Sequence, residues 1–342
     1  MKEYDTGEKV AVVIVTWNSA RDIRECLQSV YSQTYPVNQV VVVDNSSGDS
    51  TVEIIEKEFP QALLLPQKKN LGFAQANNIG INHVNTDWIL TLNPDAFIRE
   101  DYIEALLRFT KDKPRTGSIG GKLLRFKETD TAPVIIDSSG IEIYRSRRVV
   151  DRGSGEIDTR QWDDIQQVFG VCAAAALYRK VALEDVKIDG EIFPSEFFSY
   201  YEDADLAWRM WRKRWEAWYF PEAVCIHRRG GSPTGSSFSR YLTHRNRSWL
   251  IARNEPVWRT ILAQPEFLEH EILMFFRLLR YPSLWRAVIE GFRGYLHALK
   301  QRKCIKDVNI SQPPFIRGTG FNRKRNLQAI NTAFIKGKKG RD

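Results

Sequence analysis

Apolar residues in the first hundred positions form short continuous runs separated by longer amphipathic segments. The runs are rich in Val, Ile and Leu and occupy positions 10–15, 40–43, 62–65 and 88–92. Continuous runs of this length are typical of strands buried on both faces of a sheet. Between them, apolar positions recur at helical spacing and predict three helices, the third over 73–81. Strands and helices in alternation predict βαβ units and a mostly parallel sheet.

Polar residues mark the starts of the first two predicted helices. Ser19 precedes Asp22 by three positions, and Ser50 precedes Glu53 in the same way. This spacing is typical of a capping box, in which side chains satisfy free N–H groups of the first helical turn. We therefore expect side-chain caps at both helix starts.

The pattern is less regular after residue 115. Residues 116–160 are rich in Gly, Ser, Thr and charge and predict strands and loops, whereas 170–180 is a run of small residues that lets another element or a ligand approach closely. Residues 217–227 predict a strand that ends at His227, and a basic, Gly-rich loop follows it. Helices dominate from Tyr241, and the last 25 or so residues have the composition of a weakly ordered basic tail.

Composition narrows the class of protein. The 342 residues are 43% hydrophobic and 12% aromatic, which is ample for a large core. Four scattered cysteines without a CxxC pair argue against a disulfide framework or a zinc site and fit a reducing compartment. No signal peptide is visible, and the longest apolar stretch near the C-terminus, 272–285, contains Arg277 and Arg280 and is too charged to span a bilayer. We expect a cytoplasmic protein, with attachment to the inner face of the plasma membrane as an open alternative.

The net charge of +8 is unevenly distributed. From Arg240 onward there are 21 Lys and Arg against 7 Asp and Glu, so this third carries +14 and the remainder −6. A basic region favours phosphate, on nucleic acid or on a membrane surface. We expect no nucleic-acid partner, because no recognisable module accompanies the charge. The aromatic, Arg-containing helical segments suit an anionic membrane surface, and ordinary packing on the rest of the protein is the alternative.

The segment 200–209, YYEDADLAWR, holds three carboxylates within four residues. Helical spacing predicts that Asp205 pairs with Arg209 on one helix face and that Leu206 and Met210 pack inward. The other two carboxylates, Glu202 and Asp203, fall at the predicted helix start, where a helix cap with a surface salt bridge is one interpretation. A cap needs one carboxylate, and a carboxylate half-buried among aromatic residues can be tuned to accept a proton. We therefore favour a catalytic base here.

Polar residues also follow the predicted strands, where ligands bind in parallel sheets. Asp44 can accept hydrogen bonds from a base or sugar, and Asp95 can bind Mg²⁺ or Mn²⁺. Each also has good turn chemistry around it, so a turn is the alternative. His227, beside two arginines, suits a metal ion or a diphosphate, although a lone histidine is often structural. No GxGxxG, P-loop, GxSxG or HExxH sequence is present.

Taken together, these motifs resemble glycosyltransferase family 2, with the GT-A fold, and more narrowly its bacterial rhamnosyltransferase-like branch. The resemblance covers roughly residues 8–235. Seven segments carry it in family order: VVIVTWNS, VVVDNSSGDST, NLGFAQANNIG, LNPDA, the small-residue run ending LYRK, FFSYYEDADLAWR and IHRRGGS. It implies an α/β, Rossmann-like, mostly parallel sheet flanked by helices, with a C-terminal helical appendage. The expected divisions are a nucleotide-sugar-binding half (8–115), an acceptor and catalytic half (116–239) and a basic, mainly helical region (240–342).

The resemblance also implies roles for individual residues. Asp203 would be the general base, with Glu202 beside it contacting the acceptor or orienting the base. Asp95 matches the last acidic position of the family's DxD motif and would hold a divalent cation, Mg²⁺ or Mn²⁺, with help from His227. Asn93 occupies the first position of that motif, a departure that leaves fewer carboxylates on the metal. The nucleotide-sugar would contact Thr16, Trp17, Asp44, Asn70, Gly72 and Asn93.

The resemblance implies an inverting glycosyltransferase of cell-surface polysaccharide synthesis. It would move a sugar, rhamnose by analogy with the branch, from a nucleotide-diphosphate donor to a glycan or polyprenyl-linked glycan acceptor. Inversion needs one carboxylate to take the acceptor proton and a cation with basic groups to neutralise the leaving diphosphate. The alternatives are a nucleotidyltransferase on a similar fold and a catalytically silent, membrane-associated binding protein.

Overall fold

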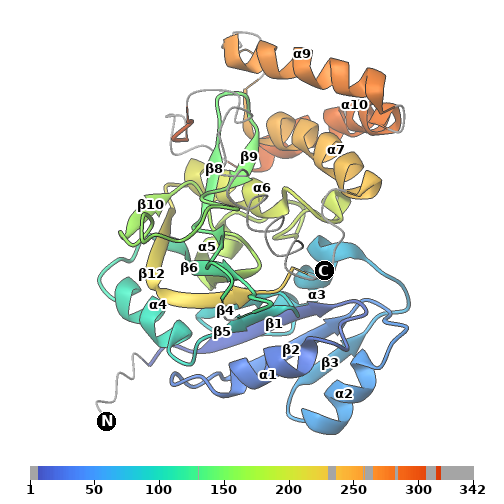
Figure 1. Cartoon of the computed structure of the whole chain (residues 1–342). Helices are drawn as coiled ribbons and strands as arrows, with labels where there is room; N and C mark the ends of the chain where they lie inside the picture. The colour runs from blue at the N-terminus through green and yellow to red at the C-terminus, as the bar shows by residue number, and fades with distance from the viewer. Residues whose placement is uncertain are drawn as a thin grey trace, which may run out of the picture.

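A large mixed sheet flanked by helices forms the centre of the molecule (Figure 1). The computed structural model describes residues 7–129, 131–229, 236–256, 258, 265–281, 284–305 and 313–316. The main strand order is β10-β12-β6-β11-β4-β1-β2-β3, with β5 beside β12 and β7 beside β6. The strands of the first half are β1 (Val10–Thr16), β2 (Gln39–Asp44), β3 (Leu63–Pro66), β4 (Trp88–Leu92) and β5 (Ala96–Ile98).

The four predicted strands and three predicted helices of the first half are all present. The helices are α1 (Ile23–Tyr31), α2 (Thr51–Glu58) and α3 (Gly72–Asn82), followed by α4 (Tyr102–Thr110). β1 pairs in parallel with β2 and β4, and β2 pairs in parallel with β3. Along β1 the side chains alternate between two cores: Val12 packs in the core cluster with α1 and α4, and Val13 in the one with α3. Burial on both faces explains why the strand sequence is a continuous apolar run.

The predicted side-chain caps of α1 and α2 are absent, so this expectation was wrong. Asp22 and Ser50 occupy the two N-cap positions, and neither side chain makes a capping hydrogen bond. The Asp22 carboxylate pairs instead with Arg228, a residue about two hundred positions later in the chain. Glu53 pairs with Lys57 one turn later, at 2.6 Å. Nearby cations thus take the carboxylates that the capping box would have used.

The second half adds antiparallel and parallel strands to the same sheet. β11 (Ala175–Arg179) is antiparallel to both β4 and β6 (Thr116–Arg125), and β12 (Glu216–His227) is parallel to β6. The remaining strands are β7 (Ile136–Ser138), β8 (Ile141–Ile143), β9 (Val149–Asp151) and β10 (Gln166–Val168), and the short helices are α5 (Lys180–Asp185) and η1 (Ser195–Phe197). The strands and loops predicted for 116–160 are therefore present.

Helix α6 (Glu202–Arg212) begins at the predicted carboxylate pair and packs against the small-residue run. A Cβ on Gly170 would lie 2.5 Å from the Cβ of Ala207, so this run does allow close approach. Leu206 and Met210 point inward, as predicted, and are almost fully buried. Asp205 and Arg209 do pair, as predicted, at 2.7 Å, and both side chains are fully buried, unlike the surface salt bridge of the alternative interpretation.

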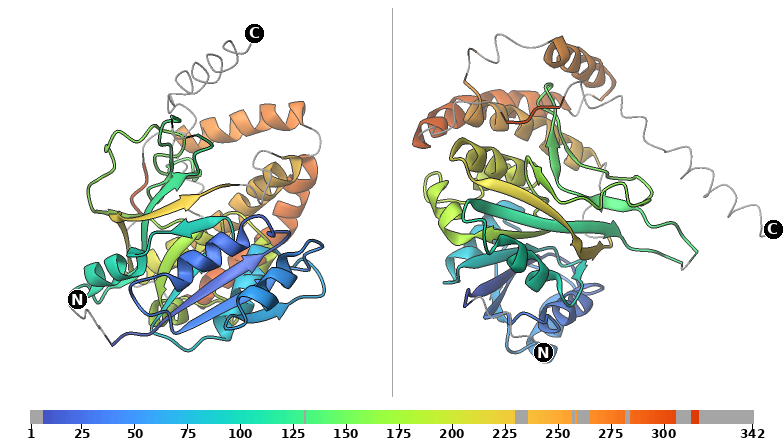
Figure 2. Two further views of the ribbon diagram at one scale, coloured as in Figure 1. Left: turned by 60° about the horizontal axis from the view of Figure 1, so that its bottom comes forward. Right: turned by 90° about the vertical axis from the view of Figure 1, so that its left-hand side faces the viewer.

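Three longer helices follow, α7 (Ser237–Asn254), α9 (Pro265–Arg280) and α10 (Leu284–Gln301), and then η2 (Arg302–Cys304). Figure 2 shows α9 and α10 on the opposite side of the molecule from α1 and α2. The predicted boundary between 239 and 240 falls inside α7, which packs directly on α6. No helix within the described residues is long and apolar enough to cross a membrane. The predicted loop at 230–235 and the basic tail from 317 lie outside the described residues.

Candidate active site

The strand register brings several predicted donor-binding residues to one edge of the sheet. Thr16 pairs with Asp44 across β1 and β2, and the end of β4 lies beside β1 on the other side. The hydroxyl of Thr16 donates to the Asp44 carboxylate at 2.8 Å, and the backbone N–H of Ser47 donates to it at 2.9 Å. Asp44 is therefore buried and fixed in orientation. Trp17, by contrast, is 47% exposed at the rim of this edge, where a planar ring can stack.

Asn70 and Gly72 form a tight bend at the start of α3. The side-chain oxygen of Asn70 accepts from the backbone N–H of Gly72 at 2.8 Å. Gly72 has φ +81, and a Cβ there would lie 2.5 Å from the backbone oxygen of Phe198. Only glycine tolerates both the left-handed backbone and this contact. The bend, which lies at the candidate donor-binding edge, is therefore in contact with the loop that precedes α6.

Asp95 and His227 lie together at the adjacent strand ends, as expected. The Nε2 atom of His227 is 3.2 Å from Oδ1 of Asp95 and 3.4 Å from Nδ2 of Asn93. The other ring nitrogen, Nδ1, is 2.8 Å from Oδ2 of Asp137. Burial lowers the pKa of His227, but the contacts with Asp137 and Asp95 outweigh burial and raise it to about 9. Without a metal the imidazole is thus a cation between two carboxylates, and binding of a metal at Nε2 would release the proton from that nitrogen.

Three further charged residues complete this cluster, and no motif in the sequence predicted two of them. Asp137 is fully buried and pairs with Arg229, which also reaches Asp151 at 3.2 Å. Asp137 lies in β7 and Asp151 ends β9, both within the irregular stretch 116–160. Neither follows a long apolar run, so no local pattern distinguished it from a surface carboxylate. Arg229 was expected only as one of two basic neighbours of His227.

Asp95 and His227 fit a divalent cation as a partial ligand set. No group of three or more His, Cys, Asp or Glu side chains able to hold a metal is found within the described residues. Mg²⁺ characteristically takes one or two protein ligands and completes its shell with substrate phosphates and water. A carboxylate on Nδ1 of a histidine orients Nε2 toward a metal, and Asp137 occupies that position. The residues present therefore suit a cation that binds with a diphosphate.

The other predicted pair, Glu202 and Asp203, starts α6. Asp203 accepts from the backbone N–H of Ala204 at 2.7 Å and from that of Ala173 at 3.5 Å. Burial, and then the charge of Asp151, raise the pKa of Asp203 to about 6. Burial and the neighbouring Asp203 raise the pKa of Glu202 well above its usual range, and one of its carboxyl oxygens has no hydrogen-bond partner. Burial thus disfavours the charged form of both carboxyls, and Asp203, with its pKa of about 6, is still largely ionised at neutral pH.

Two consecutive alanines connect the candidate catalytic residues Glu202 and Asp203 to the candidate donor-binding edge. The backbone N–H of Ala173 contacts Asp203, and the carbonyl of Ala173 accepts from Thr91 in β4 at 2.9 Å. The carbonyl of Ala174 accepts from the backbone N–H of Asn93 at 2.9 Å. The carboxylate that can accept a proton and the segment that carries Asp95 are therefore built on the same stretch of backbone.

This arrangement defines a class of protein: a transferase of the GT-A fold, with the candidate donor-binding edge on one side and the carboxyls of Glu202 and Asp203 on the other. The family model "Glycosyl transferase family 2" matches residues 11–187, more than half of the chain. The chain therefore belongs to glycosyltransferase family 2 and is a glycosyltransferase. This answers the choice between a glycosyltransferase and a nucleotidyltransferase.

Several named relatives agree with this family. The chain is 26% identical over 284 residues to the N-acetylglucosaminyl-diphospho-decaprenol L-rhamnosyltransferase of Mycobacterium tuberculosis, covering 73% of this chain and 87% of the relative. It is 25% identical over 229 residues to the poly-beta-1,6-N-acetyl-D-glucosamine synthase of Staphylococcus epidermidis, covering 65% and 50%. A match to the glycosyltransferase GlyA of Streptococcus pneumoniae is 30% identical but covers only 30% of this chain and 15% of GlyA.

Solved structures agree on the fold. GalNAc-T7 with UDP, GalNAc and Mn²⁺ superposes with a TM-score of 0.55 at 12% identity, covering 72% of this chain and 48% of that one. S. aureus TarS 1-349 in complex with UDP-GlcNAc superposes with a TM-score of 0.50 at 18% identity, covering 87% and 83%. The expected sheet, its flanking helices and the helical C-terminal region are thus confirmed.

Proposed function

We propose that this glycosyltransferase moves a sugar from a nucleotide-diphosphate donor to a glycan or polyprenyl-linked glycan, with inversion at the anomeric carbon. The observation that carries the proposal is the pair of adjacent carboxyls at the start of α6, in which Asp203 accepts from the backbone N–H groups of Ala173 and Ala204. Asp203, with its pKa raised to about 6, is largely ionised at neutral pH and can accept a proton. Burial raises the pKa of Glu202 well above its usual range, and in its protonated form it can donate a hydrogen bond to the acceptor or to its neighbour.

In this mechanism Asp203 removes the proton from the acceptor hydroxyl as that oxygen attacks the anomeric carbon. The bond to the diphosphate breaks on the opposite face, and negative charge develops on the leaving group. Inverting transfer needs no second carboxylate to protonate that group, unlike hydrolysis by a glycosidase. Asp44 and Thr16 would hold the nucleotide base, with Trp17 stacking on it, and Asn70, Gly72 and Asn93 would border the sugar-nucleotide.

Asp95 and His227 would hold the divalent cation, Mg²⁺ or Mn²⁺, whose charge stabilises the leaving diphosphate. Arg229 supports the same side as a cation held beside Asp137 and Asp151. The name of the mycobacterial relative specifies a polyprenyl-linked acceptor and a rhamnosyl donor for that protein. It supports rhamnose as the first donor sugar to test, and a role in cell-surface polysaccharide synthesis.

The test is Asp203→Asn, assayed with a panel of nucleotide-diphosphate sugars and either Mg²⁺ or Mn²⁺. The amide preserves shape but cannot accept the proton, so turnover should fall by about 10²–10⁴ while donor binding persists. Near wild-type turnover would place the base elsewhere. Asp95→Ala should weaken donor binding, with His227→Ala a milder form, and full activity in excess chelator would reject the metal assignment.

We further propose that α9 and α10 attach the enzyme to an anionic membrane surface at the cytoplasmic face. Along α10 the residues Trp285, Ile289, Phe292 and Leu296 recur at helical spacing and are 44%, 50%, 78% and 66% exposed. The basic residues Arg286, Arg293 and Lys300 are exposed beside this apolar stripe. On α9 a second exposed stripe comprises Leu268, Ile272, Phe276 and Leu279. Apolar stripes flanked by cations are typical of helices that lie in a membrane interface.

Point substitutions test this proposal without removing α7, which packs on the catalytic helix. The Phe292→Glu, Leu296→Glu double variant should lose binding to vesicles that contain anionic lipid, and wild-type binding should fall as salt rises. Val181→Glu is the matched control, because Val181 is 60% exposed but lies on α5. Unchanged vesicle binding by the double variant would reject the proposal. So would wild-type protein that ignores vesicles but forms dimers that the double variant disrupts.

A further inference from the structure

The loop that leads into the catalytic pair has an unusual backbone. Phe198, Tyr200 and Tyr201 have φ of 65, 70 and 74, in the region that favours glycine. Side chains with a Cβ are disfavoured there, so a stretch with three such residues persists only when its surroundings hold it. The loop ends at Glu202 and Asp203. The position of both carboxyls therefore depends on whatever fixes this loop.

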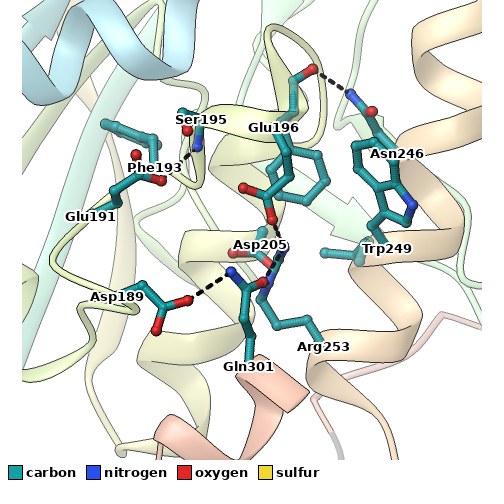
Figure 3. Close-up of polar contacts among 12 residues, drawn as sticks. Asp189, Glu191, Phe193, Ser195, Glu196, Asp205, Asn246, Trp249, Arg253 and Gln301 are labelled. Atoms are coloured by element: carbon teal, nitrogen blue, oxygen red, sulfur yellow. Dashed lines mark hydrogen bonds and ion pairs between the residues drawn. The ribbon is translucent and has the colours of Figure 1, made fainter. Parts of the chain in front are cut away.

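Asn246, on α7, supplies much of that restraint. Its side chain is fully buried and its Nδ2 atom donates to the carbonyls of Phe197, Ser199 and Tyr200, at 3.0, 2.9 and 2.8 Å. Two N–H groups thus serve three carbonyls, which only a closely folded loop can present to one amide. Figure 3 shows Asn246 directed at this loop from α7.

Arg245, the preceding residue on α7, reinforces the contact. Its Nη2 atom donates to the carbonyls of Glu196 and Phe197 at 2.9 and 3.1 Å. Its Nε atom donates to the side-chain oxygen of Asn246 at 2.9 Å. This last bond fixes which end of the Asn246 amide faces the loop.

The opposite side of the loop touches the donor edge. The carbonyl of Phe198 accepts from the backbone N–H of Ala74 at 3.1 Å, at the start of α3. The Phe198 ring lies against Gly72, where an added Cβ would be 2.6 Å from its Cδ2 atom. The loop is therefore packed between α7 on one side and the bend at Asn70 and Gly72 on the other. We expect this bend to border the nucleotide-sugar.

We propose that Asn246 is a positioning residue for the transfer reaction, which sets the placement of Asp203 through the carbonyls of the 197–201 loop. It touches neither substrate nor cation. The proposal rests on the assignment of Asp203 as the base. It predicts a specific kinetic signature, because a misplaced base slows the chemical step more than it weakens binding of the donor.

The experiment compares Asn246→Ala with Asn254→Ala in the full-length protein. Asn254 is a matched control on the same helix: it is also buried, and it donates to Asp205 at 2.8 Å but to no carbonyl of the loop. We expect Asn246→Ala to lower kcat by about 10- to 100-fold, because a displacement of about 1 Å can cost this much. The donor Kd should change by less than about threefold, since Asp44 and Asp95 are untouched. Asn254→Ala should leave kcat close to wild type.

Hydrogen exchange gives a readout that does not depend on activity. The amides of 197–201 should exchange faster in Asn246→Ala and at the wild-type rate in Asn254→Ala. Arg245→Met, which leaves the Asn246 amide in place, should show a smaller change of the same kind and provides a second variant if Asn246→Ala folds poorly. Equal loss of kcat in the two asparagine variants, or unchanged exchange in the loop, would overturn the proposal. Altered exchange in a protein with no transferase activity would instead reject only the proposed function.

Discussion

The Nδ1 atom of His227 lies 2.8 Å from Oδ2 of Asp137, and this contact leaves Nε2 facing Asp95. Asp137 is 90 positions earlier in the chain and lies on a different strand. The orientation of the imidazole is therefore set by a residue outside the family motifs from which we propose a cation site. Loss of such a second partner of a metal-binding histidine typically costs about 10- to 100-fold in metal affinity.

We expect Asp137→Asn to weaken cation-dependent binding of a nucleoside diphosphate by about 10- to 100-fold, because the amide no longer anchors the imidazole. Calorimetric titration of the diphosphate with and without Mn²⁺ measures this. Asp163→Asn is the control, since Asp163 pairs with Lys122 on a half-exposed surface away from the strand ends. Asp137 also balances Arg229, so melting of both variants should be recorded. Equal affinities would show that His227 needs no orienting carboxylate.

The rate of transfer should fall at acidic pH. The pKa of Asp203, raised to about 6 by burial and by Asp151, means that the base becomes protonated as the pH drops through this value. Well below it, kcat should decrease about tenfold per pH unit. Donor binding measured at the same pH values separates this effect from loss of the cation. A kcat that stays level down to pH 5 would contradict the assignment.

Glu202→Gln should stabilise the protein at high pH. The pKa of Glu202 is raised in the folded state, so ionisation opposes folding once the pH exceeds the usual glutamate value of about 4.3. Above this value wild-type stability falls by at most about 1.4 kcal/mol per pH unit until the raised pKa is passed, and glutamine avoids that loss. Urea unfolding of both proteins should give equal free energies near pH 4 and a growing advantage for glutamine toward pH 8. A constant difference between them would show that Glu202 titrates normally.

Gly72→Ala should damage both folding and donor binding. The new Cβ would meet the Phe198 backbone at 2.5 Å, and the alanine must also adopt φ +81. Gly190→Ala isolates the second effect, because Gly190 has φ +83 and nothing within 4 Å of the added Cβ. The backbone penalty alone is about 1–2 kcal/mol, so the control should lose that much and Gly72→Ala clearly more. Thermal unfolding and donor titration test the pair, and equal losses would mean that Phe198 moves aside freely.

Local patterns in the sequence predicted the strands and helices whose own spacing of apolar residues shows which faces are buried. The run 10–15 is apolar throughout because both faces of β1 are covered, and α6 shows helical spacing because one face, with Leu206, packs inward. Asp44 and Asp95 could be placed at one edge because parallel strands end together. The family motifs then supplied the roles that we propose for them.

Contacts between distant segments could not be predicted in this way. The capping box at Ser19 failed because the carboxylate of Asp22 is taken by Arg228, about two hundred positions later. The pairing of Asp205 with Arg209 was predicted, but not its burial under α7, whose Arg253 is 3.1 Å from Asp205 (Figure 3). Asp137 and Asn246 carry no local pattern at all. Their significance lies entirely in which residues the fold brings beside them.

The double attachment of α7 limits how this enzyme can be recombined with its relatives. On one side the helix holds the 197–201 loop through hydrogen bonds from Asn246. On the other side it packs against α10, where a Cβ on Gly294 would lie 2.4 Å from Trp249. The segment after α10 and η2 returns to α6, since Arg212 donates to the carbonyl of Ile305 at 2.8 Å. A chimera joined before Ser237 would therefore replace Asn246 and its contacts with the 197–201 loop as well as the C-terminal helices. The exchangeable module is smaller: α9 and the outward-facing residues of α10, grafted onto a native α7.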